Sequence, residues 1–336
     1  MKMNVAISLN EKFTRYGYVM LSSLFCQHEN DEMKVFVLHR ELSEQRKDEY
    51  KKLADNYRNK EVIFLEVTKE EFSNALPSTE KWPVEIYYRL LLPFLLPKEE
   101  RILYLDTDII VREPLYELYE LPFDGKLLWG AIDNNDGNLT ENQEKLFADI
   151  RENNPEFHYI NSGVLLMNLN GLRETYQPKD IEELAMKQAQ LLFAFDQDLI
   201  NYLFYDRIGY LNGERYNFFA RLYHNSGYTY QDVTEKKVAI VHYSGAKPWS
   251  GQNLLTDLDR FWWDEAKKTP YFGELLEERT FEEMEVGYEN SHEFFYADYR
   301  LKEATREVDR LRKKEEEYLL LIRDSKELIE KLSVQQ

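Results

Sequence analysis

The feature that most constrains the fold is the alternation of short apolar runs with longer amphipathic or charged stretches over the first 105 residues. Apolar runs of four or five residues are typical of buried strands, and the stretches between them have the spacing of helices. This order predicts parallel strands joined by crossover helices, which is an α/β fold. We expect strands over residues 5–9, 34–38, 62–65 and 101–105, and helices over residues 16–26, 43–56 and 87–96.

The middle of the chain continues the same pattern without an internal repeat or a low-complexity linker. We expect further strands over residues 127–132, 159–169 and 238–243, and helices over residues 180–190 and 196–204. In open α/β sheets, ligands bind beyond the carboxyl ends of the strands. The residues directly after Leu9 and directly after Leu105 are therefore the first candidates for a functional site.

Charge and cysteine content exclude several classes of function. The formal net charge is −19, which disfavours nucleic acid and anionic lipid as partners, because both are negatively charged. An acidic chain that binds a phosphorylated substrate needs a local positive element, such as a metal ion. The one cysteine, Cys26, permits neither a disulfide within the chain nor a cysteine metal site. Without a signal-like segment or a run of 18 apolar residues, we expect a cytoplasmic protein with no transmembrane segment.

An apolar strand that ends in Asp106-Thr107-Asp108 is the most informative motif. Two carboxylates separated by one residue on extended backbone point the same way, so they can bind one hard cation. Mg²⁺ and Mn²⁺ both accept carboxylate oxygens. A cation held there would neutralise a departing diphosphate and would supply the positive element that the acidic chain requires.

A second apolar strand ends in His242, which is followed by Gly245 and Lys247. Imidazole is a suitable third ligand for Mn²⁺ beside two carboxylates. Gly245 allows a ligand to approach the backbone closely, and the Lys247 ammonium would neutralise a phosphate. The two motifs together predict a metal and phosphate site.

The motif Leu-Tyr-Leu-Asp-Thr-Asp, ending at Asp108, and the motif His-Tyr-Ser-Gly-Ala-Lys-Pro-Trp, beginning at His242, resemble those of glycosyltransferase family 8. This retaining group includes the lipopolysaccharide galactosyltransferases and glycogenin. The resemblance runs from about Val5 to Trp249 and implies a GT-A fold, a Rossmann-like mixed sheet flanked by helices. It also implies a UDP-hexose donor, galactose or glucose, and Mn²⁺ held by Asp106, Asp108 and His242, for which Mg²⁺ could substitute.

The same resemblance assigns further residues to the donor. Ser8 and Asn10 would meet the uridine, Arg89 would reach the donor, and Asp133 would meet the sugar hydroxyls. Asn161 and Ser162 would lie beside the same sugar, and Asp196 and Gln197 would lie under the reacting carbon. The donor-binding set implied in this way comprises Ser8, Asn10, Arg89, Asp106, Thr107, Asp108, Asn161, Ser162, Gln197, His242, Gly245 and Lys247.

The chain departs from the family pattern at two places. Asn10 stands where the family usually has Asp, although its amide can still bond to uracil. Only Ala246 separates Gly245 from Lys247, where the family commonly has two residues. The loop that would wrap the diphosphate is therefore one residue shorter.

The catalytic candidates are Gln197, Asp196 and Asp133, and none is an unambiguous nucleophile. We therefore expect front-face attack on the anomeric carbon, with an oxygen of the UDP β-phosphate as the base. A phosphotransferase in which Asp106 is the nucleophile is a weaker alternative, because that chemistry usually places Asp-x-Asp after the first strand. A non-catalytic sugar-binding or scaffold protein with an interaction tail is the other alternative.

The character of the chain changes beyond about residue 269. We predict a GT-A domain over residues 1–268 and a helical C-terminal region over residues 269–336. Apolar residues recur there at heptad-like spacing, at Leu301, Ala304, Val308, Leu311, Tyr318, Ile322, Ile329 and Leu332. This pattern fits either a helix packed on the domain or a coiled coil that forms a homodimer, and it suggests docking of a partner or of the acceptor. The acceptor would be a glycan, on a bacterial surface polysaccharide, a lipid or a glycoprotein.

Overall fold

The structure, a computed structural model, describes residues 1–68, 76–79, 83–287, 306 and 310–319. Residue contacts divide the chain into two units. The first comprises Met1–Trp249 and Asn253–Leu276, and the second comprises Ser250–Gln252 and Glu277–Gln336. The first unit contains both predicted motifs.

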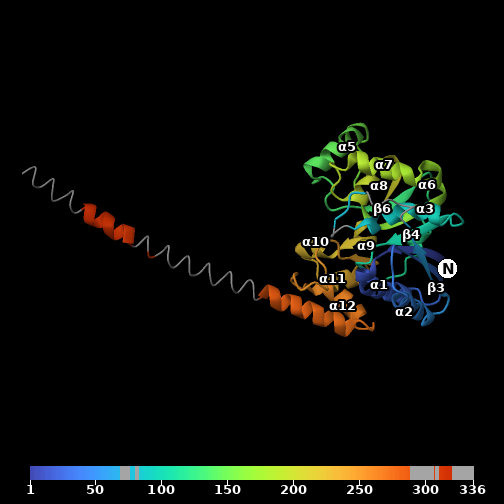
Figure 1. Ribbon diagram of the computed structural model, residues 1–336, viewed down its shortest axis with the longest axis horizontal. Coiled ribbons are helices and arrows are strands. Elements are labelled where there is room, and N and C mark those ends of the chain that lie inside the picture. Colours follow the sequence, from blue (N-terminus) through green and yellow to red (C-terminus); the bar gives the residue numbers. More distant parts are fainter. Residues whose placement is uncertain (69–75, 80–82, 288–305, 307–309, 320–336) are drawn as a thin grey trace, which may run out of the picture. The chain divides into compact units, whose positions relative to one another are not determined.

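A seven-stranded mixed sheet forms the centre of the first unit (Figure 1). The strand order is β3-β2-β1-β4-β7-β6-β8, and β7 runs antiparallel to its neighbours β4 and β6. The strands are β1 Lys2–Ser8, β2 Glu32–His39, β3 Lys60–Glu66, β4 Arg101–Leu105, β6 Leu128–Ile132, β7 Ile160–Asn168 and β8 Ile208–Leu211. The expected α/β fold with a mixed sheet is confirmed.

A small second sheet, with the order β5-β10-β9, completes the site region. Its strands are β5 Ile109–Val111, β9 Phe218–Phe219 and β10 Ile240–His242. β10 pairs antiparallel with β5 and parallel with β9. The chain thus leaves the large sheet at Leu105 and enters the small sheet at Ile109, so the motif Asp106–Asp108 is the link between the two sheets.

Helices cover both faces of the large sheet. Figure 1 shows α1, α2 and α12 on one side and α5 to α8 on the other. Val5 and Ile7 are buried with the first group, whereas Ala6 is buried with the second. Burial on both faces explains why the strands read as continuous apolar runs. The helices are α1 Thr14–Gln27, α2 Glu44–Asp55, α3 Leu92–Leu95, α4 Tyr116–Tyr119, α5 Glu141–Asn153, α6 Leu169–Thr175, α7 Pro178–Gln188, α8 Phe195–Phe204, α9 Gly213–Tyr216, α10 Ala220–Asn225, α11 Tyr230–Glu235 and α12 Arg260–Ala266.

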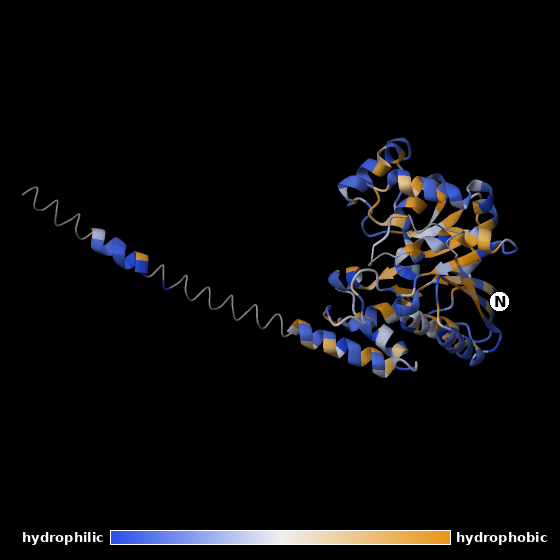
Figure 2. Ribbon diagram, viewed as in Figure 1, coloured by the Kyte–Doolittle hydropathy of each residue, from blue (hydrophilic) through white to orange (hydrophobic). Residues whose placement is uncertain are grey.

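Several helical regions differ from the expectation, and two of them have a clear physical reason. The predicted helix over residues 87–96 is a 3-10 helix, Val84–Leu91, followed by the short α3. Pro93 has no backbone N–H, so it cannot donate the hydrogen bond that a continuous α-helix over that range would need at this position. Helix α5 was not predicted, although Thr140 and Gln143 form a capping box at its start. Figure 2 shows why its apolar signal is weak, since α5 is largely hydrophilic in colour.

The C-terminal part of the chain is described only in pieces. Residues 310–319 are helical, and Leu311 and Tyr318 are exposed. The other predicted heptad positions, Leu301, Ala304, Val308, Ile322, Ile329 and Leu332, lie outside the described residues. The first unit extends to Leu276, because Tyr271 and Leu275 are buried in its core. Among the described helices, none combines the length and the apolar character that crossing a membrane requires.

Candidate active site

The two motifs meet in a cavity of about 590 Å³ beyond the carboxyl ends of β1 and β4. This is the position that the strand pattern predicts for a ligand. Every predicted site residue except Asp133 lines this cavity: Ser8, Asn10, Arg89, Asp106, Thr107, Asp108, Asn161, Ser162, Asp196, Gln197, His242, Gly245 and Lys247. Asp133 does not line the cavity, but it accepts hydrogen bonds from two lining residues, Asn161 and Gln197.

Backbone hydrogen bonds hold the metal-ligand candidates in place. The Asp106 N–H donates to the Gly163 carbonyl at 2.8 Å, and the Tyr243 N–H donates to the Asp108 carbonyl at 2.9 Å. Asp106, Asp108 and His242 each present one ligand atom, and these atoms lie within 4.8 Å of one another. Two carboxylate oxygens and one imidazole nitrogen are donors that suit Mn²⁺, so these residues fit the metal that the motif predicts.

A glycine makes this convergence sterically feasible. A Cβ atom at Gly163 would lie 2.5 Å from His242 Cε1 and 2.7 Å from Asp106 Oδ2. Both distances are shorter than any normal contact, so only glycine at this position of β7 leaves room for the two ligands.

Asp108 lies between two cationic or polar partners. His242 Nε2 lies 3.1 Å from Asp108 Oδ1, and the Lys247 ammonium donates to the other carboxylate oxygen. Burial would raise the pKa of Asp108, but the adjacent Lys247 and His242 hold that pKa well below its usual range. Asp108 is therefore an ionised carboxylate at neutral pH, as a candidate metal ligand requires.

Arg89 is a buried cation that joins two acidic residues. Its guanidinium lies 3.0 Å from Asp106 Oδ1 and 3.1 Å from Asp196 Oδ2. Its planar group also stacks 4.3 Å from the centre of the Tyr104 ring. Burial raises the pKa of Asp196 to about 7 despite the opposing effect of Arg89. Asp106 and Asp196 thus share the Arg89 cation, and the Asp196 carboxyl group titrates near neutrality.

Asn161 and Gln197, which line the cavity, form a hydrogen-bonded cluster with Asp133. Gln197 Oε1 accepts hydrogen bonds from the Ser162 N–H at 2.9 Å and from Asn161 Nδ2 at 3.0 Å. Asp133 Oδ2 accepts from Asn161 Nδ2 at 3.1 Å and from Gln197 Nε2 at 3.3 Å. Because the Gln197 oxygen has both lone pairs occupied, it is poorly placed to act as a nucleophile.

The start of α8, which presents Asp196 and Gln197, is held by a fully buried carboxylate. Asp198 accepts from the backbone N–H groups of Phe193 and Ala194 at 2.7 and 2.9 Å. It also accepts from the Tyr159 hydroxyl at 2.6 Å and from Gln143 at 2.7 Å. These bonds hold a turn in which Phe195 has a φ of 33°, a backbone conformation that is costly for a residue with a side chain.

The buried Asn217 contacts two of the predicted site residues but was not itself predicted. Asn217 Oδ1 accepts a hydrogen bond from His242 Nδ1 at 2.7 Å, and its Nδ2 donates to Asn161 Oδ1 at 3.0 Å. Asn217 lies between two aromatic residues, 25 positions before His242, and belongs to neither motif. Spacing along the chain therefore contains no signal for it.

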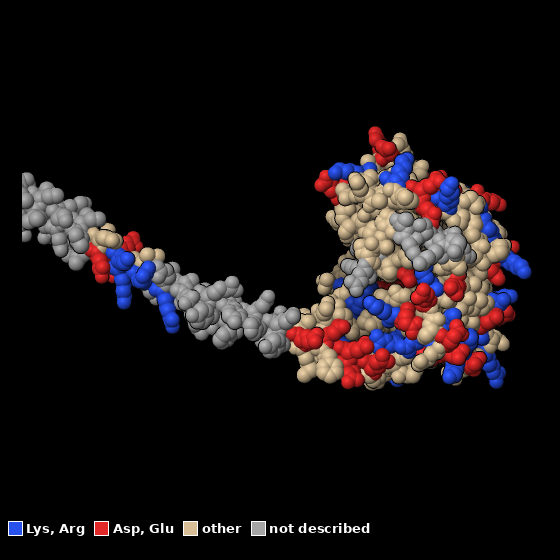
Figure 3. Space-filling model, viewed as in Figure 1, with Lys and Arg blue, Asp and Glu red and all other residues tan. Residues whose placement is uncertain are grey.

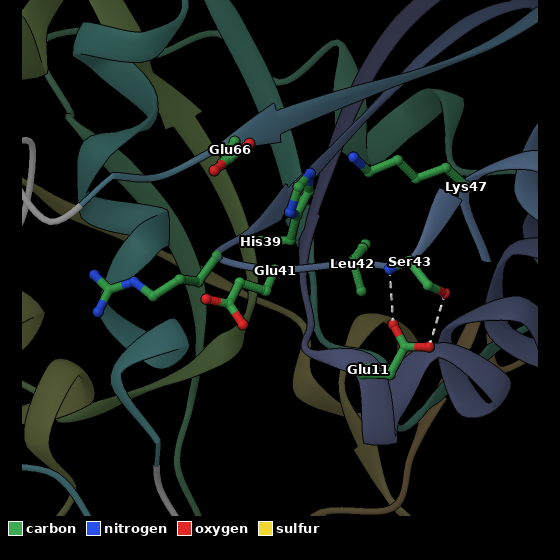
Figure 4. Close-up of a pocket in the computed structure, with 8 residues that line it drawn as sticks. Glu11, His39, Glu41, Leu42, Ser43, Lys47 and Glu66 are labelled. Carbon is green, nitrogen blue, oxygen red and sulfur yellow. Dashed lines mark hydrogen bonds between the residues drawn. The ribbon is translucent and has the colours of Figure 1, made fainter. Parts of the chain in front are cut away.

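A second cavity, of about 600 Å³, lies beyond the ends of β2 and β3 (Figure 4). Figure 4 shows Glu11 turned toward Ser43, whose backbone N–H and hydroxyl donate to the Glu11 carboxylate at 3.1 and 2.9 Å. The charged side chains on its walls include both signs, such as Glu66 and Lys47. None of the predicted site residues lines it.

Comparison with known proteins places the chain in a family. A sequence model of the family described as "Glycosyl transferase family 8" matches residues 4–253. The chain belongs to glycosyltransferase family 8. The family resemblance expected from the two motifs is thereby confirmed, and all residues of the cavity fall within the matched range.

Two bacterial glycosyltransferases are similar in sequence to this family 8 chain. It is 27% identical over 269 residues to the lipopolysaccharide 1,2-glucosyltransferase of Escherichia coli, and the aligned region covers 77% of this chain and 76% of that protein. It is 28% identical over 188 residues to the glycosyltransferase GlyB of Streptococcus pneumoniae serotype 4, which covers 53% of this chain and 41% of that protein.

The fold is also shared with a solved glycosyltransferase structure. The galactosyltransferase LgtC, in complex with donor and acceptor sugar analogs, matches with a TM-score of 0.66 and 25% identity. The match covers 80% of this chain and 96% of LgtC. The expected GT-A fold is confirmed by this similarity.

Proposed function

We propose that this family 8 enzyme transfers a hexose, glucose or galactose, from a UDP-sugar to a glycan acceptor, with retention at the anomeric carbon and in a Mn²⁺-dependent manner. The observation that carries the proposal is the convergence of Asp106, Asp108 and His242 with Lys247 in one cavity. These groups form a diphosphate site within an otherwise acidic protein.

The candidate ligand atoms and their charges support Mn²⁺ as the metal. Asp106, Asp108 and His242 would hold the ion, and Mg²⁺ could substitute for it. When bound, the metal would neutralise charge that develops on the diphosphate as UDP leaves. Figure 3 shows acidic and basic side chains interspersed on the visible face, so surface charge alone does not provide a focused anion site there.

The protein side chains have distinct proposed roles. Lys247 would stabilise the departing UDP through its ammonium group. Asp133, Asn161 and Gln197 would bind the hydroxyls of the donor sugar, and Arg89 would orient the acidic wall formed by Asp106 and Asp196. Ser8 and Asn10 would contact the uridine.

Retention is proposed to follow front-face attack. The acceptor oxygen bonds to the anomeric carbon as the bond from that carbon to UDP breaks, and an oxygen of the β-phosphate takes the acceptor proton. The Gln197 oxygen already accepts two hydrogen bonds, which argues against a covalent adduct there. Detection of a glycosyl adduct on Asp196 would overturn this mechanism.

The proposed donor sugars are glucose and galactose. One relative is named as a glucosyltransferase, whereas LgtC is named as a galactosyltransferase. The acceptor is proposed to be a bacterial surface polysaccharide or a protein-linked glycan, and the C-terminal region, residues 269–336, is proposed to dock the acceptor or a second copy.

The first experiment measures release of UDP from a panel of nucleotide sugars by the purified full-length chain. Slow release from one UDP-hexose, present with Mn²⁺ and abolished by EDTA, is the expected result. Asp106→Asn should lower that release by about 100-fold or more, because it removes a carboxylate from the proposed metal site. No release from any donor, combined with no Mn²⁺-dependent binding of UDP, would contradict the proposal.

A further inference from the structure

Asn217 connects the metal-ligand set with the cluster that faces the donor sugar. It lies between α9 and β9 and is fully buried, with an exposed fraction of 0%. Its oxygen accepts from His242 Nδ1, and its nitrogen donates to Asn161 Oδ1. One short amide therefore bridges two parts of the site.

The orientation of this amide follows from a backbone group. The Gly163 N–H donates to Asn161 Oδ1 at 3.0 Å, and a backbone N–H can only donate, so this Asn161 atom is the acceptor oxygen. The Asn217 atom beside it must then be the NH₂ group, and the Asn217 atom beside His242 must be the oxygen. His242 consequently carries a hydrogen on Nδ1.

This arrangement determines which ring nitrogen faces the metal ligands. With Nδ1–H bonded to Asn217, the other nitrogen, Nε2, is the one that lies 3.1 Å from Asp108. Metal-binding histidines generally donate their second ring N–H to a partner, which orients the ring and makes the ligand nitrogen more basic.

The hydrogen-bond chain continues to the Asp133 carboxylate. Asn161 uses its oxygen for Gly163 and Asn217, so its nitrogen is left to donate to Asp133 Oδ2 and Gln197 Oε1. Every donor thus points from His242 toward Asp133. A flipped Asn217 amide would oppose a donor to His242 Nδ1–H and an acceptor to Asn161 Oδ1, so only one orientation satisfies both ends.

We propose that Asn217 is a positioning residue that holds His242 ready to bind the metal and, through Asn161, sets the geometry of the donor-sugar cluster. This inference rests on the proposed Mn²⁺ site. Asn217 itself need not touch the metal or the substrate.

Two substitutions separate the two ends of the bridge. Asn217→Ala removes the acceptor for His242 and the donor for Asn161. Asn217→Asp has nearly the same shape and keeps an oxygen beside His242, but it places its second oxygen against Asn161 Oδ1. The alanine variant should therefore affect both ends, and the aspartate variant should affect mainly the sugar end.

Two kinds of binding are measured. Mn²⁺ binding, with and without UDP, is monitored through the electron paramagnetic resonance signal of the free ion. The affinities for UDP and for UDP-hexose are measured as well. Asn217→Ala should weaken Mn²⁺ binding by about 10- to 100-fold. Asn217→Asp should retain the Mn²⁺ and UDP affinities of the unsubstituted chain while it loses affinity for UDP-hexose. A purely structural role for Asn217 would not produce this rescue of metal binding by aspartate.

Asn4→Ala is the matched control, because Asn4 is a buried amide of β1 that bonds to Glu99, outside the cavity. It should lower the melting temperature without changing Mn²⁺ affinity. Unchanged Mn²⁺ affinity in a folded Asn217→Ala variant would overturn the inference, as would an equal loss of Mn²⁺ affinity in Asn217→Asp, which remains decisive if the alanine variant does not fold. Failure of the unsubstituted chain to bind Mn²⁺ would instead overturn the metal site, and the role of Asn217 with it.

Discussion

At the residue scale, Gly163 shows how one missing side chain shapes the site. Its hydrogen atoms face the His242 ring and the Asp106 carboxylate, both of which are held by other contacts. The space available to these two candidate ligands therefore depends on Gly163, which has no side chain.

Gly163→Ala should displace His242 or Asp106 and lower Mn²⁺-dependent turnover by about 100-fold, since displacements of about 1 Å have effects of this size. Turnover and Mn²⁺ affinity measured together would check this. Gly273→Ala is the control, because a Cβ atom there meets nothing within 4 Å. Equal activity in the two variants would show that the site tolerates the added methyl group.

Asp196 offers a test of the balance between burial and ion pairing. Its pKa is raised from 3.8 to about 7, so the folded chain keeps a proton that the unfolded chain releases above about pH 4. Stability therefore falls as the pH rises from about 4 to 7, and this contribution is constant above that window.

Asp196→Asn removes this titration, so the variant should gain stability relative to the unsubstituted chain as the pH rises from about 4 to 7. The relative gain should approach about 1.4 kcal/mol per pH unit within the window. Urea unfolding of both chains in EDTA at several pH values would measure it. A relative loss of stability with rising pH would mean that Arg89 outweighs burial and that the pKa is lowered.

At the scale of elements, the start of α8 depends on side chains from other elements. Asp198 receives hydrogen bonds from its own turn, from Gln143 of α5 and from Tyr159 next to β7. The turn presents Asp196 and Gln197 to the cavity, so the positions of these site residues depend on α5 and on the strand beside it.

Asp198→Ala should lower the free energy of unfolding by about 3 kcal/mol or more, because several buried donors lose their acceptor. Urea denaturation would measure the change. Asp180→Ala is the control: Asp180 accepts from the Gln177 N–H at the exposed start of α7, and its loss should cost about 1 kcal/mol. Equal effects of the two substitutions would exclude a special role of Asp198.

At the scale of the whole molecule, the boundary of the catalytic unit is decided by packing. The predicted boundary after residue 268 lies before Tyr271 and Leu275, which are buried in the first unit. Arg46 Nη1 donates to the Tyr271 hydroxyl at 3.0 Å, and the Tyr18 and Tyr271 rings meet edge to face at 5.2 Å. Residues 269–276 thus stabilise α1 and α2.

A chain of residues 1–276 should retain the fold and Mn²⁺-dependent UDP release, whereas a chain of residues 1–268 should be less stable by about 3 kcal/mol or more, because it loses a buried Leu and a buried Tyr. Thermal melts and donor hydrolysis would compare the two. Similar melting temperatures would show that residues 269–276 contribute little.

The same 1–276 chain tests the proposed role of the C-terminal region. If that region mediates self-association or acceptor docking, removing residues 277–336 should reduce the oligomer seen by light scattering or lower acceptor turnover, while donor hydrolysis is kept. Unchanged oligomeric state and unchanged acceptor turnover would remove this role.

Features that depend on neighbouring residues could be predicted from the amino-acid sequence. The strands over residues 5–9 and 101–105 were predictable because burial on both faces requires continuous apolar runs. The Asp106–Asp108 motif and the His242 to Lys247 motif were predictable because each stands at the end of such a strand. Short elements such as β5 and β9 were not, because two or three residues contain no periodic signal.

The way in which the separate motifs are joined could not be predicted, because it depends on contacts between distant elements. The pairing of β10 with β5 brings His242 opposite Ile109 and so next to Asp108, across more than 130 residues of sequence. Gly163 and Asn217 belong to the site for the same reason: the close approach of β7 and the Asn217 amide bridge exist only once the two sheets have packed. Their roles arise from distances between elements, and spacing along the chain does not encode such distances.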